Sequence, residues 1–377
     1  MRVLIAGGGV GGLTLAGLLE QRGIHPVVVE KAHRYGDVGF VLALWPVGSR
    51  VLKGLGLYQL FEERSVTYTT YSLVREDGSL IKRYELDSLN DRFGPLRGIA
   101  RSAMLSVLQD GCRNVEIRMG TTVEGLIQEG KEVAVQFSDG TRSTFDLVVG
   151  CDGIHSRVRE LLFGPVPVQP SGWSTWAFWV NPTIAESIHL VKEYWAPGRF
   201  VGLFPAKDRL VCYLAAPFPP GRKGIASRDD IRRLFSTMGG EIPALLEQMP
   251  EQEEIFHDDL QDLKTPDWYR GRVLLLGDAA DAILPTAGLG ASMAMESAAV
   301  LADELSRSDA QTVHRAIDLY VRRRRRRVER VVDSSRGLAR YIMVSSPLLV
   351  SLRDLYLHFT SVDTFTRDLR HLLEDPF

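Results

Sequence analysis

Residues 2–23, RVLIAGGGVGGLTLAGLLEQRG, combine an apolar run, a glycine-rich loop and a stretch with helical periodicity. The run RVLIA suits a buried parallel strand, and Gly7, Gly9 and Gly12 follow it in G-x-G-x-x-G register. Gly7 allows a tight turn, Gly9 lets the backbone approach a pyrophosphate, and Gly12 lets the helix pack closely on the strand. The helix N-terminus faces the negative charge in such a loop. The segment therefore predicts a Rossmann-type α/β unit that binds an ADP moiety.

An acidic residue follows at the end of the next apolar run. This run, PVVVE, ends at Glu30. A carboxylate at that point accepts hydrogen bonds from a ribose 2′-hydroxyl and repels a 2′-phosphate. The unit by itself fits FAD and NAD equally well.

Length and composition exclude several classes of protein. The 377 residues exceed the roughly 250 to 300 at which single cores split, so we expect two domains or an inserted layer. A formal net charge of -2 predicts no nucleic-acid or anionic-membrane partner. Cys112, Cys151 and Cys212 lack the spacing of a metal site or a redox pair, which favours a reducing cytoplasm and no metal. The sequence contains no continuous apolar segment of about 20 residues, so it predicts no membrane span.

Two later segments also join a strand to a helix. In residues 145–159, FDLVVGCDGIHSRVR, Asp152 follows an apolar strand, and Ser156 and Arg159 share one helical face. Residues 274–305, LLLGDAADAILPTAGLGASMAMESAAVLADEL, read as strand, turn and small-residue helix. No further strand and acid follow this helix, as a second dinucleotide unit requires. We therefore expect the segment to complete the first site.

The three ordered motifs resemble those of the para-hydroxybenzoate hydroxylase family of FAD-dependent aromatic-ring monooxygenases, over roughly residues 1–340. The resemblance implies non-covalent FAD and NAD(P)H as a transient electron donor. It implies that Asp278 holds the ribityl chain, that the turn after Pro285 passes the flavin ring, and that the next helix N-terminus faces the pyrimidine end. It also implies that Arg101 reaches the phosphates or ribityl chain and that Gly39 lies where the backbone passes the flavin.

The expected FAD contacts are Gly7, Gly9, Val10, Gly11, Gly12, Glu30, Lys31, Gly39, Arg101, Asp152, Asp278, Pro285, Gly288, Leu289, Gly290 and Ala291. Three positions depart from the family pattern. Asp281 stands where relatives usually carry His, and Ser292 and Glu296 stand where they often carry Asn and Asp. These departures bear on any proton-relay or ring-adjacent role of the three positions.

The middle of the chain predicts a substrate-binding layer. Alternating, aromatic-rich segments at 67–86 and 172–219 suit a mixed or antiparallel sheet over the flavin. Apolar residues such as Trp173 can line a cavity for an aromatic or polycyclic substrate. In some relatives an Arg and a Tyr of this layer orient and activate a phenol-like substrate. By that resemblance Arg199 and Tyr213, together with Pro285, are the candidate catalytic residues.

The fold class is thus α/β, a Rossmann-type FAD-binding domain with an interleaved mixed-sheet substrate domain and C-terminal helices. The predicted parts are an FAD-binding domain at 1–72, 96–165 and 266–307, a substrate layer at 73–95 and 166–265, and a C-terminal helical region at 308–377. The acidic segment 251–262 predicts an exposed connection, and the six-arginine run in 321–331 predicts a solvated helix. The amphipathic stretch 341–359 suits packing on the body or on a partner subunit, with peripheral membrane contact as a minor alternative.

The predicted activity is hydroxylation or epoxidation of an aromatic or polycyclic small molecule with NAD(P)H and O2, through a C4a-hydroperoxyflavin. One alternative is an FAD-dependent reductase or dehydrogenase of a prenyl or other apolar substrate. Another is a non-catalytic FAD-binding carrier or regulatory protein. A flavin halogenase is disfavoured, because the W-x-W-x-I-P motif of that family has no match. The expected assembly is a monomer or homodimer without stable membrane insertion.

Overall fold

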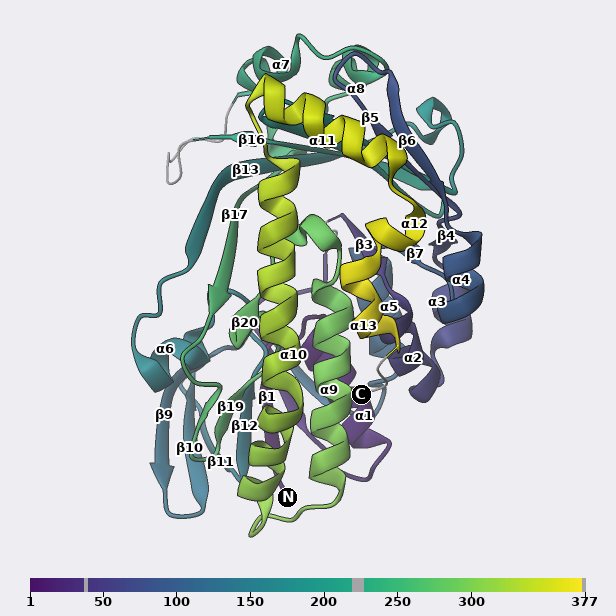
Figure 1. Ribbon diagram of the computed structural model, residues 1–377. Coiled ribbons are helices and arrows are strands. Elements are labelled where there is room, and N and C mark those ends of the chain that lie inside the picture. The colour runs from purple at the N-terminus through teal and green to yellow at the C-terminus, as the bar shows by residue number, and fades with distance from the viewer. Residues whose placement is uncertain (37–39, 219–226, 375–377) are drawn as a thin grey trace.

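The computed structural model describes residues 1–36, 40–218 and 227–374. Two large sheets lie at opposite ends of the molecule, and the helix α10 (Val313–Ile342) extends between them (Figure 1). The α/β class with a mixed-sheet layer and C-terminal helices is confirmed. Among the described residues, no helix has both the length and the apolar character needed to cross a lipid bilayer.

A six-stranded sheet holds the N-terminal unit, in the order β18-β19-β12-β1-β2-β8. Its strands are β1 (Val3–Ala6), β2 (Val27–Glu30), β8 (Glu116–Met119), β12 (Leu147–Gly150), β18 (Tyr269–Arg270) and β19 (Val273–Leu275). β1 pairs in parallel with β12, which pairs in parallel with β19. The carboxyl ends of adjacent parallel strands meet at one sheet edge, where α/β proteins bind ligands. The three sequence motifs, each of which follows one of these strands, therefore converge there.

An eight-stranded mixed sheet forms the other layer, in the order β20-β17-β13-β16-β15-β14-β5-β6. Its strands are β5 (Thr70–Val74), β6 (Leu80–Glu85), β13 (Gln169–Val180), β14 (Leu190–Ala196), β15 (Arg199–Ala206), β16 (Arg209–Pro217), β17 (Phe256–Lys264) and β20 (Asp281–Ala282). β5 and β14 are parallel, and the other pairs are antiparallel. Side chains alternate between two faces, one of which packs on α7 (Arg228–Phe235) and α8 (Ile242–Glu247).

The acidic segment 251–262 is not the exposed connection that its charge predicted. Its second half enters β17, which lies between β13 and β20. Asp262 is buried there and pairs with Arg336 of α10. Because the buried carboxylate has a guanidinium partner, the strand tolerates a charge that would be costly if unpaired.

Smaller elements complete the two layers. The two three-stranded sheets contain β3 (Val41–Leu44), β4 (Val66–Thr67) and β7 (Arg97–Ala100), and β9 (Val123–Glu129), β10 (Glu132–Phe137) and β11 (Arg142–Phe145). The other helices are α1 (Val10–Glu20), α2 (Pro46–Gly54), α3 (Tyr58–Glu63), α4 (Asp87–Phe93), α5 (Arg101–Asp110), α6 (Arg157–Phe163), α9 (Gly290–Ser306), α11 (Pro347–Phe359), α12 (Val362–Phe365) and α13 (Arg367–Glu374). The 3₁₀ turns are η1 (Pro182–Ile184), η2 (Gln252–Glu254), η3 (Gly277–Ala279) and η4 (Pro285–Ala287).

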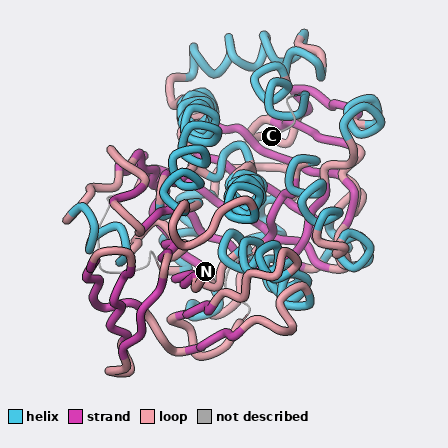
Figure 2. Tube along the Cα trace, turned by 90° about the horizontal axis from the view of Figure 1, so that it is seen from below, coloured by secondary structure: helices cyan, strands magenta, loops and turns pink. Residues whose placement is uncertain are grey.

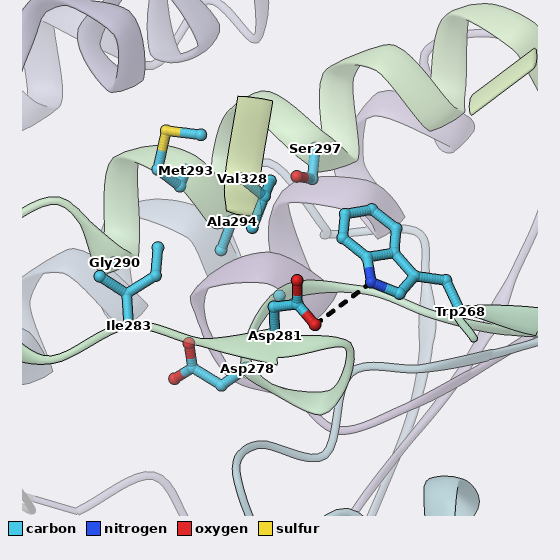
Figure 3. Close-up of a pocket in the computed structure, with 10 residues that line it drawn as sticks. Trp268, Asp278, Asp281, Ile283, Gly290, Met293, Ala294, Ser297 and Val328 are labelled. Carbon is cyan, nitrogen blue, oxygen red and sulfur yellow. Dashed lines mark hydrogen bonds between the residues drawn. The ribbon is translucent and has the colours of Figure 1, made fainter. Parts of the chain in front are cut away.

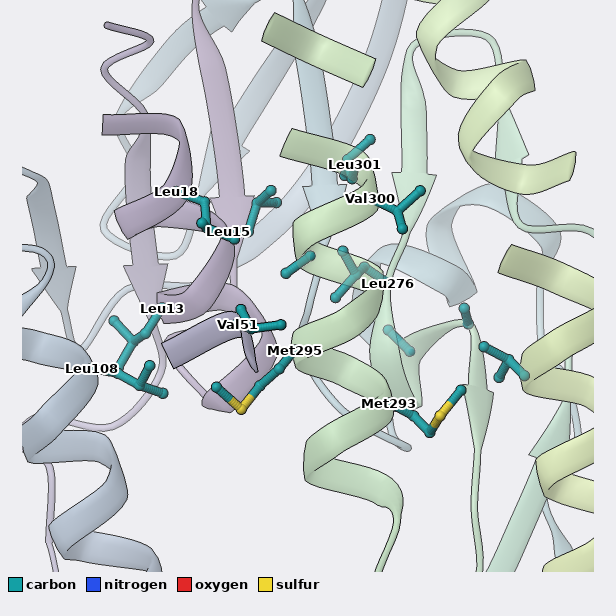
Figure 4. Close-up of a cluster of buried hydrophobic side chains, with 14 of the residues drawn as sticks. Leu13, Leu15, Leu18, Val51, Leu108, Leu276, Met293, Met295, Val300 and Leu301 are labelled. Atoms are coloured by element: carbon teal, nitrogen blue, oxygen red, sulfur yellow. The ribbon is translucent and has the colours of Figure 1, made fainter. Parts of the chain in front are cut away.

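The main core lies where α1 and α9 pack together beside β1. Leu13 and Leu15 of α1 are fully buried, as are Met295 and Leu301 of α9 (Figure 4). This packing holds the first and third motifs together, because both helices begin directly after their motif loops.

The arginine run of α10 is only partly solvated. Arg324 is fully buried and forms an ion pair at 3.0 Å with Glu296 of α9, while Arg327 reaches the same carboxylate at 2.9 Å. Arg323 and Arg325 pair with acids nearer the surface. The prediction of a solvated helix is thus wrong for Arg324, because a helix that packs on a neighbour must turn part of any six-residue run inward.

The predicted domain boundaries stay a prediction. The boundary at residue 72 falls within β5, and β20, inside the predicted FAD-binding range 266–307, pairs with β17 of the eight-stranded sheet.

Candidate active site

The glycines of the first loop differ in their surroundings. Gly7 has φ +113°, and a Cβ on it would lie 2.3 Å from the Cys151 carbonyl oxygen. A Cβ on Gly12 would lie 1.9 Å from the Gly7 carbonyl oxygen, whereas a Cβ on Gly9 would meet no atom within 4 Å. Gly7 and Gly12 are therefore required by packing, and Gly9 faces open space.

The N-terminus of α1 opens onto the same space. Its N-cap is Gly9, no side chain caps it, and its first turn, which includes Val10 and Gly11, contains no acid. Exposed N–H groups and the positive end of the helix dipole suit a pyrophosphate. The loop thus fits the dinucleotide cofactor that its sequence predicts.

Glu30 is held rigidly at the end of β2. Its carboxylate accepts hydrogen bonds from the N–H of Gly8 at 2.7 Å and the N–H of Ala32 at 2.9 Å. The adjacent Lys31 is exposed. These contacts fix the carboxylate beside the glycine loop, where a ribose hydroxyl can reach it.

Tyr35 is a residue that the sequence analysis missed. A Cβ on Gly8 would lie 2.3 Å from its hydroxyl, which is buried and has no partner among the described residues. Burial and the charge of Glu30 raise the pKa of Tyr35, so the hydroxyl stays a hydrogen-bond donor. The only signal in the sequence was an aromatic residue shortly after the acid.

The second motif fastens two loops together. The Asp152 carboxylate accepts hydrogen bonds from the Ser156 hydroxyl at 2.5 Å and the Val158 N–H at 3.0 Å. Arg159 donates to the Ala279 carbonyl at 3.0 Å, so α6 is bonded to the turn after β19. The motif positions the Asp278 turn against the first loop.

Asp278 and Arg101 come close together in the fold. Asp278 is reachable by solvent, yet desolvation by the surrounding protein raises its pKa to about 6, and the charge of Arg101 opposes this shift. The Arg101 N–H donates to the Phe40 carbonyl at 2.6 Å at the start of α5. Gly39 lies outside the described residues. The carboxylate and guanidinium offer one acceptor and several donors to a ribityl chain.

The turn from Pro285 to α9 is held by an indole. Trp45 donates through Nε1 to the Ala287 carbonyl at 3.2 Å, and Gly288 adopts the left-handed conformation with φ +60°. Pro285 is exposed, Leu289 is buried, and Gly290 and Ala291 begin α9 without a side-chain cap. The open N-terminus of α9 is suited to an electron-rich ligand edge.

Two of the three departures from the family pattern, Ser292 and Glu296, connect α9 to neighbouring segments. The Ser292 hydroxyl accepts a hydrogen bond from the Trp45 N–H at 3.1 Å. Glu296 pairs with Arg324 and Arg327, as described above. Both side chains are fully buried and connect α9 to its neighbours.

Asp281 lines a small, partly open cavity (Figure 3). One oxygen, Oδ1, accepts hydrogen bonds from the Thr265 N–H at 2.8 Å and from Trp268 Nε1 at 3.3 Å. The other, Oδ2, is buried without a partner among the described residues, and burial raises the pKa of Asp281 to about 7. The cavity of about 10 Å³ has room for about one water. Asp278 and Ser297 also line it.

The eight-stranded sheet turns an aromatic face toward the Pro285 turn. Leu284, directly before Pro285, belongs to a buried cluster with Trp173 and Leu260, and Phe200 and Tyr213 pack against it. Burial raises the pKa of Tyr213, and the nearby charge of Asp258 adds to this effect. Tyr213 thus keeps a protonated hydroxyl at the edge of this apolar cluster, close to Thr175 and Asp258.

The structure separates Arg199 from Tyr213. Arg199 forms an ion pair with Glu76 at 2.9 Å and donates to Leu234 and Thr237, on the α7 side of the sheet. Because successive strand residues point to opposite faces, Arg199 lies on the face opposite Phe200 and Tyr213. The two candidates therefore do not face one substrate together, and Arg199 lies away from the aromatic face.

Comparisons with known proteins agree with this geometry. A family model described as "FAD binding domain" matches residues 1–335. The chain is 30% identical over 309 residues to the 2-heptyl-3-hydroxy-4(1H)-quinolone synthase of Pseudomonas aeruginosa, covering 80% of each chain. It is 31% identical over 309 residues to the 3-amino-4-hydroxybenzoate 2-monooxygenase of Streptomyces cremeus, covering 80% of this chain and 77% of the relative.

A solved structure shares the whole fold. Klebsiella pneumoniae HpxO complexed with FAD and uric acid superposes with a TM-score of 0.90 at 22% identity, covering 99% of this chain and 97% of that chain. The family match extends over most of the chain and includes all three motifs. The protein therefore belongs to the FAD-dependent monooxygenases that resemble para-hydroxybenzoate hydroxylase, and FAD is its cofactor.

Proposed function

We propose that this protein uses NAD(P)H and O2 to hydroxylate an apolar aromatic or polycyclic small molecule. The substrate would lie between the aromatic face of the eight-stranded sheet and the Pro285 turn. The observation that carries this proposal is the cluster of Trp173, Leu260 and Leu284 beside the hydroxyl-bearing Tyr213. Mostly apolar surfaces with few polar groups are typical of sites that bind aromatic ligands.

In this reaction one oxygen atom of O2 enters the substrate and the other leaves as water, while NAD(P)H supplies two electrons. The chemistry that bound FAD supplies is the transfer of those two electrons to O2 and the delivery of one oxygen atom to the substrate. Only one dinucleotide-binding loop is expected in the sequence, so the nicotinamide donor would bind transiently.

The chain's own residues would bind the cofactor, orient the substrate and exclude water from the site. The open loop at Gly9 and the N-terminus of α1 would hold the pyrophosphate, and Glu30 with Tyr35 would hold the adenosine ribose. Asp278 and Arg101 would hold the ribityl chain. Lys31, Gly39 and Asp152 remain predicted contacts, although both carboxylate oxygens of Asp152 are already bonded within the protein.

Tyr213 would donate a hydrogen bond to an oxygen or nitrogen of the substrate. Its pKa, raised by burial, keeps it protonated at neutral pH. The apolar residues around it exclude water from the reacting ring. Pro285 would lie beside the flavin ring and contribute only its shape, without a hydrogen bond.

Two relatives support the substrate class, because the quinolone synthase and the aminohydroxybenzoate monooxygenase carry names of aromatic compounds. Three free thiols among the described residues support a reducing compartment, for which we propose the cytoplasm.

The test is to supply the purified FAD-loaded protein with NADH or NADPH, ¹⁸O2 and a panel of aromatic metabolites. We expect one compound to accelerate NAD(P)H oxidation and to gain a single ¹⁸O atom. Product that forms equally well without O2 would support the reductase alternative instead. A flavin that NAD(P)H does not reduce with any ligand would support the carrier alternative.

A further inference from the structure

Helix α11 carries a line of exposed apolar side chains. The α11 stripe consists of Leu348, Leu349, Leu352, Leu355, Tyr356 and Phe359. Their exposure ranges from 54% for Leu349 to 78% for Phe359. Figure 1 shows α11 in front, near the top of the molecule, and Figure 2 shows it along the upper edge, so the helix lies at the surface.

The buried face of α11 combines its two charged residues with Val350 and Leu357. Arg353 and Asp354 are both 4% exposed. Arg353 donates to the Trp195 carbonyl at 2.7 Å, and Asp354 pairs with Arg75 at 3.2 Å. An ordinary surface helix turns its apolar side inward. In α11 the polar contacts of Arg353 and Asp354, together with the burial of Val350 and Leu357, decide which face turns inward, so the fold itself leaves the stripe exposed.

The spacing of the stripe is that of a helix-pairing seam. Leu348, Leu352, Leu355 and Phe359 follow one another at intervals of four, three and four residues, as a and d positions do. The pattern is self-complementary about a two-fold axis between Arg353 and Asp354. In an antiparallel pair centred there, Leu348 meets Phe359 of the second copy, and Leu352 meets its Leu355.

Charge and area favour a second copy as the occupant. The exposed polar residues of α11 are Ser351 and His358, so two copies of the stripe bring no like carboxylates or ammonium groups together. Exposed Lys and Arg, which draw amphipathic helices to anionic lipid, are absent from α11. Six half-exposed large side chains amount to roughly 600 to 800 Å², close to the ~800 Å² that each partner contributes to a standard interface.

We propose that the α11 stripe is the homodimer interface of this protein, with the two α11 helices antiparallel about a two-fold axis. The proposal stands apart from the proposed reaction, because the stripe lies on the outer surface of α11 and includes none of the residues assigned to FAD or substrate.

Sedimentation velocity on the FAD-loaded full chain tests the interface. We expect a dimer for the wild type and a monomer for L352E/L355E, because burial of two unpaired carboxylates per chain raises the dimer Kd more than ~100-fold. The matched control I127E/L319E changes two exposed apolar residues elsewhere and should stay dimeric. Flavin absorbance and Tm confirm that each variant is folded. A wild type that is monomeric at ~100 μM, or a dimeric L352E/L355E, overturns the proposal.

Crosslinking tests the orientation. A mixture of L352C chains and L355C chains, oxidised together, should form mostly the mixed disulfide dimer, with the wild type as the control for native thiols. Crosslinks mainly between identical variants contradict the antiparallel arrangement. Flotation of the wild type with phosphatidylcholine vesicles, lost in L352E/L355E, would instead assign the stripe to a lipid surface.

Discussion

The indole of Trp268 donates a hydrogen bond to Oδ1 of Asp281 at 3.3 Å, while Oδ2 of the same carboxyl has no partner among the described residues. A buried carboxylate with one unsatisfied oxygen is costly, so the folded state favours the protonated form and the pKa rises to about 7. Glu329 raises this pKa further and Arg325 lowers it.

This arrangement predicts a pH-dependent effect of D281N on stability. The pKa of Asp281 in the folded state is above the value of about 3.9 for an unfolded chain. The contribution of the protonated carboxyl to the free energy of unfolding is therefore lost as pH rises from about 4 through 7. The side-chain amide introduced by D281N resembles the protonated carboxyl but does not titrate, so this variant does not lose stability as pH rises. Relative to the wild type, D281N should gain roughly 2 to 3 kcal/mol in the free energy of unfolding between pH 5 and pH 8.

Urea unfolding at both pH values measures this gain. Asp208, exposed in the turn between β15 and β16, offers the control D208N, whose difference from the wild type should stay constant with pH. A constant difference for D281N as well would show that the Asp281 carboxyl is charged throughout this range.

Gly9 and Gly12 should respond differently to the same added methyl group. A Cβ on Gly9 meets no atom, so G9A should fold normally, with a Tm of the FAD-free protein within about 2 °C of the wild type. Its methyl group would occupy the space expected for the pyrophosphate, and the Kd for FAD should rise at least ~10-fold, by flavin fluorescence titration.

By contrast, G12A places a Cβ 1.9 Å from the Gly7 carbonyl oxygen and should lower the yield of folded protein. If G9A binds FAD as tightly as the wild type, the pyrophosphate does not lie at this loop.

The buried ion pair between Glu296 and Arg324 should be costly to break on one side. E296A leaves Arg324, which is fully buried, without its carboxylate and should lower the free energy of unfolding by ~3 to 5 kcal/mol. The double variant E296L/R324M removes both fully buried charges and should lose much less, because the third member, Arg327, is only partly buried and also donates to the Leu372 carbonyl. Urea unfolding of the three proteins gives the comparison, and equal losses would mean that volume, and not charge, decides stability at this position.

Tyr213 and Arg199 provide a matched pair for the substrate site. Y213F should lower kcat/KM by ~10-fold through loss of one hydrogen bond, with FAD content unchanged. R199Q breaks the ion pair with Glu76 on the other face and should lower Tm by about 2 °C without changing kcat/KM. Steady-state kinetics with the substrate found by the ¹⁸O2 screen measure both effects. A reversed outcome would place the substrate on the α7 side of the sheet.

Local patterns in the sequence were sufficient to predict much of this protein. The three strand–loop–helix motifs predicted the Rossmann-type sheet, because glycine positions and hydrophobic periodicity depend on the backbone close by. Their resemblance to a known family implied the FAD cofactor. The second motif was predicted as a ligand contact, whereas Asp152 and Arg159 bond mainly to the protein itself. Asp152 bonds to residues four and six positions along the chain, whereas Arg159 bonds to Ala279 in a distant segment, which the motif alone does not predict.

What the sequence by itself determined is therefore the fold class and the cofactor, and the tertiary structure decided which side chains face each other. Arg199 and Tyr213 lie on opposite faces because strand pairing sets which alternate residues face the flavin domain. The acidic β17 became an interior strand because Arg336, from a distant helix, compensates Asp262. Arg353 and Asp354 lie on the buried face of α11 for the same reason, since partners far along the chain satisfy charges that local periodicity predicts to be exposed.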